Sequence, residues 1–432
     1  MSWLDKLTFF FLCALIFILP VSIAGVEVFS VLAIFLFLIK RAVGRSSTVH
    51  DKDGQKTTLW YGLPWWVVLP VGLYVLFGLV SVFLSCDGGL SLKGFVGKVL
   101  KVAMVFFVMV GTLTSRERIR TFLSCFLASA FILCLDSLWQ AVMGWDLLKH
   151  QALVDGRVGA LMKHPNDLGA YLIVVIPLMF AMGYQSWHEQ KGEKKVRQYL
   201  VSGLWLVGFL AAFTVLVMTY SRSAWVGFLF GMGLWAAIRR SWKTFALFAF
   251  LFIFVFTPVA VEKRGLSQLA PSKVSEMWTG PLKIMNGGLN SSDRLIYWRD
   301  AIRIIQDHPW TGTGLNTYSK VIMQYSNWHQ NYAHNCYLQV AAELGFVGLA
   351  IFLWVLFGPL VLVLQRLKSM TDPVWRGILC AVAVGYAAIL AESALDTTFY
   401  SVQLSMLIWL VMSLLVVISQ FGESVEARTS SN

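Results

Sequence analysis

The sequence predicts an all-α fold, a polytopic bundle of about twelve transmembrane helices with one large loop on the outer side of the membrane. The first observation is composition. Hydrophobic residues make up 57% of the 432-residue chain and charged residues 13%, about half the charged fraction of an ordinary soluble domain. The second is that apolar runs of membrane-spanning length recur from end to end. The third is that basic residues gather in alternate loops between these runs.

The apolar runs divide the chain into three parts. Residues 1–261 hold nine predicted transmembrane helices, residues 262–334 form the large loop, and residues 335–432 hold three more helices and a cytoplasmic tail. The first run is interpreted as an uncleaved span, because a second apolar run follows it at once. The predicted spans are 7–24, 26–40, 61–85, 94–113, 121–142, 166–184, 199–218, 223–238, 244–261, 335–364, 377–396 and 400–420.

The net charge of +12 is explained by topology. Basic residues concentrate in the loops within 40–56, 116–120, 191–197, 239–243 and 366–376. By the positive-inside rule these loops are cytoplasmic, and so are both termini. The long loop 262–334 is also basic, but long loops cross a membrane largely regardless of charge. Because no single basic patch forms, nucleic acid is not an expected partner.

His334 stands where the long polar loop gives way to an apolar run. If His334 were part of an α-helix, three small residues would lie within roughly 40° of it around the helix axis: Ala341, Gly345 and Gly348. We therefore expect the histidine to lie at the end of a stripe of small residues that a second helix can approach closely. An imidazole at such a surface can exchange protons near neutral pH. A lone histidine is more often a capping or core residue, but the spacing and nearby arginines favour the chemical role.

Arg222 lies in a tight turn, residues 220–223, between two predicted spans. Ser223, Gly227 and Gly231 then recur every four residues, which is typical of a close helix contact. The turn would hold Arg222 over tightly packed helices and limit its freedom. The alternative is an interfacial arginine whose guanidinium reaches towards the headgroups.

The large loop contains two predicted amphipathic helices. Ser291-Ser292-Asp293 offers an N-cap for the first, Leu295, Trp298, Ile302 and Ile305 form its apolar stripe, and His308-Pro309 ends it. The second covers Leu315 to Trp328, with Tyr318, Ile322 and Tyr325 on one side. Such helices lie on the membrane surface or roof a cavity.

Further basic residues on the outer side are candidate substrate contacts. Arg294 lies in the first turn of the first loop helix, and Arg299 follows on the same helix; a surface role is as plausible for either one alone. Arg157 lies in the outer segment 143–165. Lys98 and Lys101 lie in the outer half of the fourth span, where charges normally face a cavity or a partner.

A histidine with two or more arginines suits transfer from a pyrophosphate. Arginine remains protonated and binds phosphate through two parallel hydrogen bonds, and histidine can take a proton from a hydroxyl. Outside the cytoplasm the donor must arrive already activated, for example as a glycan linked by pyrophosphate to a lipid. The chain has no phosphate-binding glycine loop or dinucleotide fingerprint, so no cofactor is expected. His329 and His334 do not match a trusted zinc spacing, so no metal is expected either.

Several of these motifs resemble a known family. His334-Asn335, nine residues, then Gly345-x-x-Gly348 is similar to the signature of bacterial O-antigen ligases. Tyr220 to Trp225 resembles a segment of the wider superfamily of O-antigen ligases and polymerases. Asp293 to Trp298 with His308-Pro309-Trp310-Thr311-Gly312-Thr313-Gly314 resembles the loop of that superfamily, and His164 to Gly169 its Pro-Asn-x-x-Gly segment. The chain departs from the family pattern at Val226 and Asp293, which weakens the choice of ligase over polymerase.

The resemblance implies a metal-independent, inverting glycosyltransferase in the bacterial inner membrane, with its active site facing the periplasm. The donor would be an undecaprenyl-pyrophosphate-linked glycan and the acceptor lipid A-core. His334 would be the base, and Arg222 and Arg294 would hold the pyrophosphate. Arg157, Lys98, Lys101, Arg299 and Asn335 are further candidate contacts. The alternative is an O-antigen polymerase, and a more distant one is a lipid or sugar transporter, although no paired inverted halves are visible.

Overall fold

The computed structural model describes residues 3–43, 63–188, 195–240, 243, 246, 250, 291–326 and 331–421. Within these ranges the regular elements are helices, and the only β-type contacts are two isolated bridges. The all-α prediction is confirmed. Nine described helices are long and apolar enough to cross a membrane.

The nine spanning helices agree closely with nine of the predicted spans. Two further predicted spans, 7–24 and 223–238, are the shorter helices α1 (Trp3–Ile18) and α9 (Arg222–Arg239). The predicted span 244–261 lies outside the described residues. The nine spanning segments are α2 (Ile23–Val43), α3 (Trp65–Phe83), the continuous segment of α4 (Gly88–Gly94), η1 (Phe95–Leu100) and α5 (Lys101–Thr112), α6 (Arg116–Met143), α7 (Pro165–His188), α8 (Lys195–Met218), α14 (Cys336–Ser369), α15 (Pro373–Glu392) and α16 (Val402–Gln420).

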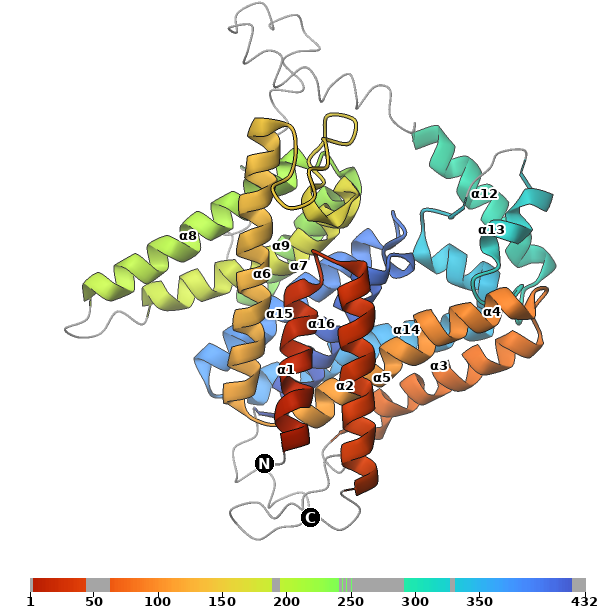
Figure 1. Cartoon of the computed structure of the whole chain (residues 1–432), viewed down its shortest axis with the longest axis horizontal. Coiled ribbons are helices and arrows are strands. Elements are labelled where there is room, and N and C mark those ends of the chain that lie inside the picture. Colours follow the sequence, from red (N-terminus) through yellow and green to blue (C-terminus); the bar gives the residue numbers. More distant parts are fainter. Residues whose placement is uncertain are drawn as a thin grey trace, which may run out of the picture.

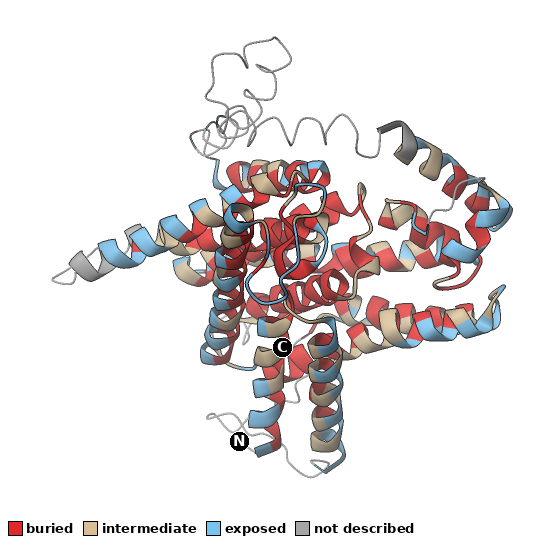
Figure 2. Cartoon of the chain, turned by 45° about the horizontal axis from the view of Figure 1, so that its top comes forward, coloured by how far each residue is buried: buried red, intermediate tan, exposed pale blue. Residues whose placement is uncertain are grey.

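The C-terminal helices form the centre of the bundle. In the most apolar 18-residue stretch of α16, 94% of the residues are buried, compared with 22% in α2 and 33% in α8. Figure 1 shows α15 and α16 enclosed by the other helices, with α8 projecting on one side and α3 and α4 on the other. Figure 2 shows exposed residues along these projecting helices. Their exposed side chains are largely apolar, as expected of helices that face lipid.

The long helix α14 differs from its predicted form. It begins at Cys336, and Asn335 is its N-cap, so His334 precedes the helix and does not share a helical face with Gly345. The prediction of a small-residue stripe beneath His334 is therefore wrong. The asparagine side chain accepts hydrogen bonds from the backbone N–H groups of Tyr337 and Leu338, both at 3.0 Å. This N-cap fixes the start of the helix at Cys336, after the histidine.

The helix is interrupted at Gly345, which has φ +66° and ψ −173°. The loop after α12 docks into this break. Phe346 N–H donates to Pro309 O at 2.7 Å, and Gly314 N–H donates to Glu343 O at 2.8 Å. The backbone groups that the break frees are thus bonded again within the protein, as a membrane helix requires. The two glycines of the sequence motif have different contacts: the backbone of Trp310 and Thr311 lies against Gly345, while Gly348 packs against Phe77 of α3.

We expect Gly345→Ala to lower the amount of folded protein in the membrane. Its backbone conformation is accessible essentially only to glycine and costs other residues about 1–3 kcal/mol. An added Cβ would also lie 2.3 Å from the backbone carbonyl of Trp310. Gly233→Ala in α9 is the matched control, because a Cβ there meets no atom within 4 Å. Membrane abundance and melting temperature of the two variants check this; equal values would contradict it.

The amphipathic helices of the large loop are confirmed, with changes in detail. Helix α12 (Ser291–Asp307) ends where His308 was expected to end it. Its buried face is Ala301, Ile304 and Ile305, whereas Leu295 and Ile302 of the predicted stripe are 63% and 44% exposed. The second predicted helix is shorter, consisting of α13 (Tyr318–Val321) and η4 (Ile322–Gln324). Tyr318 and Ile322, which were expected on one side of this helix, pack against the buried face of α12.

Candidate functional site

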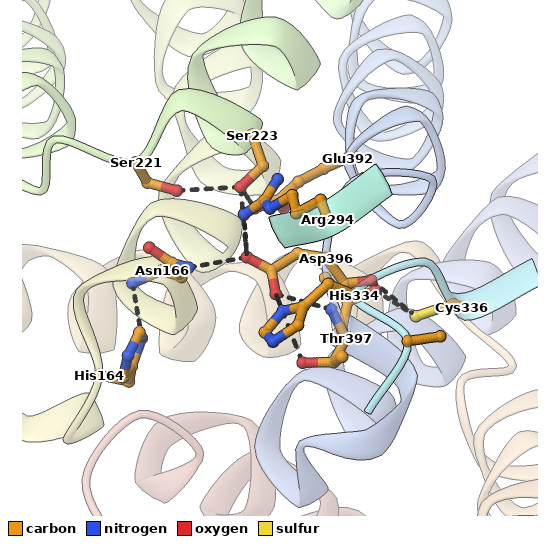
Figure 3. Close-up of polar contacts among 12 residues, drawn as sticks. His164, Asn166, Ser221, Ser223, Arg294, His334, Cys336, Glu392, Asp396 and Thr397 are labelled. Carbon is orange, nitrogen blue, oxygen red and sulfur yellow. Dashed lines mark hydrogen bonds and ion pairs between the residues drawn. The ribbon is translucent and has the colours of Figure 1, made fainter. Parts of the chain in front are cut away.

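A buried carboxylate, Asp396, is the centre of a polar cluster at one end of the bundle (Figure 3). It lies in the connection between α15 and α16. Oδ1 accepts a hydrogen bond from the Thr397 N–H at 2.8 Å. Oδ2 accepts one from the Asn166 Nδ2 at 2.8 Å and a longer one from the Ser223 hydroxyl at 3.4 Å. These contacts join the start of α7 and the start of α9 to the connection.

The structure holds His334 against this carboxylate. The distance from His334 Nδ1 to Asp396 Oδ1 is 3.3 Å, and the ring stacks on Tyr297 of α12 with 5.8 Å between centroids. His334 has a positive φ of 48°, and the chain is fixed on its C-terminal side because Cys336 N–H donates to Ser393 O at 2.8 Å. The side chain is 27% exposed, so the imidazole is oriented by the protein but remains open to a ligand.

Electrostatics define which imidazole nitrogen is available. Burial acts to raise the pKa of Asp396, but the hydrogen bond and charge of His334 and the charge of Arg294 outweigh it and lower the pKa to about 2. The carboxylate is therefore ionised at neutral pH, and its contribution to folding is lost progressively as pH falls from its ordinary pKa of 3.8 through about 2. An ionised carboxylate can only accept, so His334 Nδ1 is the donor in this contact, and Nε2 is the nitrogen that a neutral imidazole would offer as a base.

Arg294 reaches the same carboxylate from the first turn of α12. Its Nη2 lies 3.8 Å from Asp396 Oδ2, and its side chain is 25% exposed. Helix α12 is fixed by the packing of its buried face on α13, η4 and α14. The large loop thus supplies a guanidinium that contacts the same carboxylate as His334.

Arg157 and Arg222 bring two more guanidinium groups to this end of the bundle. Arg157 Nη2 donates to Asn166 Oδ1 at 2.5 Å, and its Nε donates to Thr219 O at 2.7 Å. Burial lowers the pKa of Arg157, and the positive charge of the nearby Arg222 adds to this. Arg222 is the first residue of α9 and is exposed. Arg157 is thus linked through Asn166 to Asp396, with Arg222 within electrostatic range.

The small residues of α9 explain how Arg222 is positioned. Added Cβ atoms would lie 2.8 Å from Ala388 O at Gly227 and 2.9 Å from the Ala388 Cβ at Gly231. Ser223 is buried and also hydrogen-bonds Glu392 at 3.4 Å. The predicted close-packing face of α9 is confirmed, and its partner is α15.

The remaining candidate residues have other contacts. Lys98 Nζ donates to Asn316 Oδ1 at 2.6 Å and lies 4.5 Å from the Tyr400 ring centroid. Lys101 forms an ion pair with Glu27 at 2.5 Å, and Arg299 lies 3.4 Å from Asp300. The contacts of Lys98 and Lys101 join different segments of the chain, whereas that of Arg299 lies within α12. Asn335 caps α14, which positions His334 indirectly.

Metal binding has no evident ligand set in the part of the chain that the structure describes. No three His, Cys, Asp or Glu side chains there form a group that could hold an ion. His329, the histidine considered as a second ligand, lies outside the described residues. Independence from metal stays a prediction.

Sequence reasoning missed Asp396, Asn166 and Tyr297. A signal for Asp396 was present, since Glu392 and Asp396 are two carboxylates at the end of an apolar span, where ionisable residues commonly have a function. Asn166 belongs to a motif quoted above but carried no charge to single it out. Nothing in the sequence indicated that Tyr297 would stack on His334.

These features define a polytopic membrane protein with a histidine–carboxylate pair and several arginines at one end of its helices. Residues 207–353, about a third of the chain, match the family model described as O-antigen ligase. This segment includes Arg222, Arg294 and His334, and the match supports membership of the superfamily of O-antigen ligases and polymerases. No sequence among curated proteins matches the chain.

Proposed function

We propose that this protein is a glycosyltransferase of the ligase type, which joins an undecaprenyl-pyrophosphate-linked glycan to lipid A-core on the periplasmic face of the inner membrane. The observation that carries the proposal is the pairing of His334 with the ionised Asp396, beside Arg294 and close to Arg157. Such a transfer needs a base that accepts the proton of the acceptor hydroxyl, and guanidinium groups that bind the pyrophosphate of the donor.

In the proposed reaction, Nε2 of His334 takes the proton of an acceptor hydroxyl. The acceptor oxygen attacks the anomeric carbon of the donor, and the bond from that carbon to the pyrophosphate oxygen breaks. The pyrophosphate leaves with the bonding electrons from the opposite face, so the anomeric configuration inverts. Arg222 and Arg294 would stabilise the charge that develops on the leaving group, which is commonly the largest contribution to such catalysis.

The proposal requires no metal ion. Guanidinium groups can neutralise a pyrophosphate without a cation, and His334 Nε2 is available without coordination. Transfer that survives exhaustive chelation supports this step. Abolition by a chelator with rescue by one divalent cation would replace it by metal-assisted departure of the pyrophosphate.

A polymerase that extends the lipid-linked glycan is the second candidate, because it would use the same donor and base with a different acceptor. A deletion strain separates the two. A ligase predicts that long lipid-linked chains accumulate and that lipopolysaccharide lacks them. A polymerase predicts lipopolysaccharide bearing a single repeat unit, and normal lipopolysaccharide in the deletion strain would exclude both.

We expect Arg222→Lys to lower transfer about tenfold or more, because lysine keeps the charge but loses the planar fork that binds phosphate through two hydrogen bonds. Arg303→Lys is the matched control, since Arg303 is half exposed and lies 3.6 Å from Asp300 on the loop helix. The rate of transfer in membranes, normalised to protein abundance, is the measurement. Full activity in Arg222→Lys would contradict a role in binding pyrophosphate and would indicate that Arg222 only contacts the membrane interface.

A further inference from the structure

A cavity lies at the ends of α7, α9 and α15 that are farthest from the polar cluster around Asp396. It is open, about 470 Å³ in volume, and is formed by α7, α9 and α15. Arg222 and Arg239 are the first and last residues of α9, so at 1.5 Å per residue the two ends are about 26 Å apart. That length approaches the roughly 30 Å thickness of the hydrocarbon. The cavity therefore lies near the membrane surface opposite to His334.

The cavity has two cationic groups, Arg239 from the end of α9 and Arg376 from the start of α15. Both are exposed, and both guanidiniums are close enough to Cys380 to act on its thiol. Within the described ranges neither forms an ion pair with an acidic side chain; the acid nearest to Arg376 along the chain, Asp372, instead bonds Arg116 at 2.8 Å and caps α15. Among the described residues, no acidic side chain therefore neutralises the charges of Arg239 and Arg376.

The rest of the lining is apolar or aromatic. Phe180 and Trp235 pack edge to face, with ring centroids 5.6 Å apart, and Ile238 lies beside them. Arg239 lies over the Tyr184 ring at 5.2 Å from its centroid. This contact leaves the planar group free to donate hydrogen bonds along its edge. A cavity lined by two guanidinium groups and several aromatic or apolar side chains suits a ligand that has both a phosphate headgroup and an apolar part, and suits a soluble anion less well.

We propose that this cavity binds the phosphate headgroup of an anionic phospholipid from the adjacent leaflet. Arginine binds a phosphodiester through paired hydrogen bonds, and juxtamembrane basic residues are attracted to anionic headgroups. The apolar wall would hold the upper part of an acyl chain. The site is separate from the transfer chemistry, so it does not depend on the proposed function.

The test is native mass spectrometry of the full-length protein, released from vesicles that contain phosphatidylglycerol and phosphatidylethanolamine. Wild-type protein should retain phosphatidylglycerol preferentially. Removing one arginine should lower the affinity for phosphatidylglycerol about fivefold. The double variant Arg239→Gln/Arg376→Gln should therefore bind this lipid roughly 25-fold more weakly than the wild type. The matched control is Arg240→Gln, the next residue, which is exposed but does not line the cavity; it should bind as the wild type does. Added inorganic phosphate should not displace the lipid.

Each other outcome overturns the proposal. Equal retention in the double variant and the wild type would exclude the two arginines. A comparable loss in Arg240→Gln would indicate only a general surface charge. Displacement by inorganic phosphate would indicate a site for a soluble anion. A photoactivatable phosphatidylglycerol should label peptides that contain Trp235 or Cys380, and failure to label either would exclude the cavity as the binding site of the lipid.

Discussion

Replacing His334 with alanine is expected to lower glycan transfer by about 10²–10⁴-fold, which is the usual contribution of a general base. The amount of folded protein should change little, because His334 precedes the helix and is 27% exposed. The variant removes the Nε2 that would take the acceptor proton but leaves the Asn335 cap and the docked loop in place. Transfer is measured in membranes and divided by protein abundance.

Gly345→Ala is the comparison variant for this experiment. It should fail through lower abundance, while its activity per folded molecule should remain closer to that of the wild type. If His334→Ala lowers abundance as much as Gly345→Ala, the histidine is structural. If transfer is intact in His334→Ala, another group is the base.

Asp396→Asn is expected to lower transfer by about 10²-fold or more. The amide is close in shape but carries no charge, so it cannot stabilise the imidazolium formed when His334 takes a proton. Its NH₂ group can also donate to His334 Nδ1, which would place the ring proton on Nε2, the wrong nitrogen for a base. Arg294 would lose its counter-charge at 3.8 Å as well.

The control for this prediction is Asp307→Asn in the large loop. Asp307 accepts a hydrogen bond from the Tyr325 hydroxyl at 2.7 Å and is exposed. Losing this exposed contact should leave transfer unchanged. An unchanged rate in Asp396→Asn would mean that the pair seen in the structure does not orient the base.

The transmembrane helices were predictable from sequence because their extent follows from hydropathy, which is a local property. The break at Gly345 was not. Glycines three residues apart within an apolar run are typical of helix packing, and only the position of the loop backbone at Trp310 shows that the first glycine serves a left-handed turn. The same break and the cap at Asn335 explain why helical spacing gave a wrong position for His334.

The site was predictable in its basic residues and not in its acidic one. His334, Arg222 and Arg294 stand in recognisable motifs at or beside the ends of helices. Asp396 becomes central only because α7, α9 and α12 converge on the connection after α15, and this convergence is tertiary. In the same way, Lys98 and Lys101 looked available for a ligand until helix packing placed Asn316 and Glu27 beside them.

The most direct test of the account is transfer by the purified full-length protein, reconstituted in vesicles with an undecaprenyl-pyrophosphate-linked glycan, lipid A-core and excess chelator. The account predicts that glycosylated lipid A-core and free undecaprenyl pyrophosphate appear in equal amounts, and that neither appears with His334→Ala. Equal product formation by wild type and His334→Ala would contradict it, as would a wild-type protein that forms no product from this donor and acceptor.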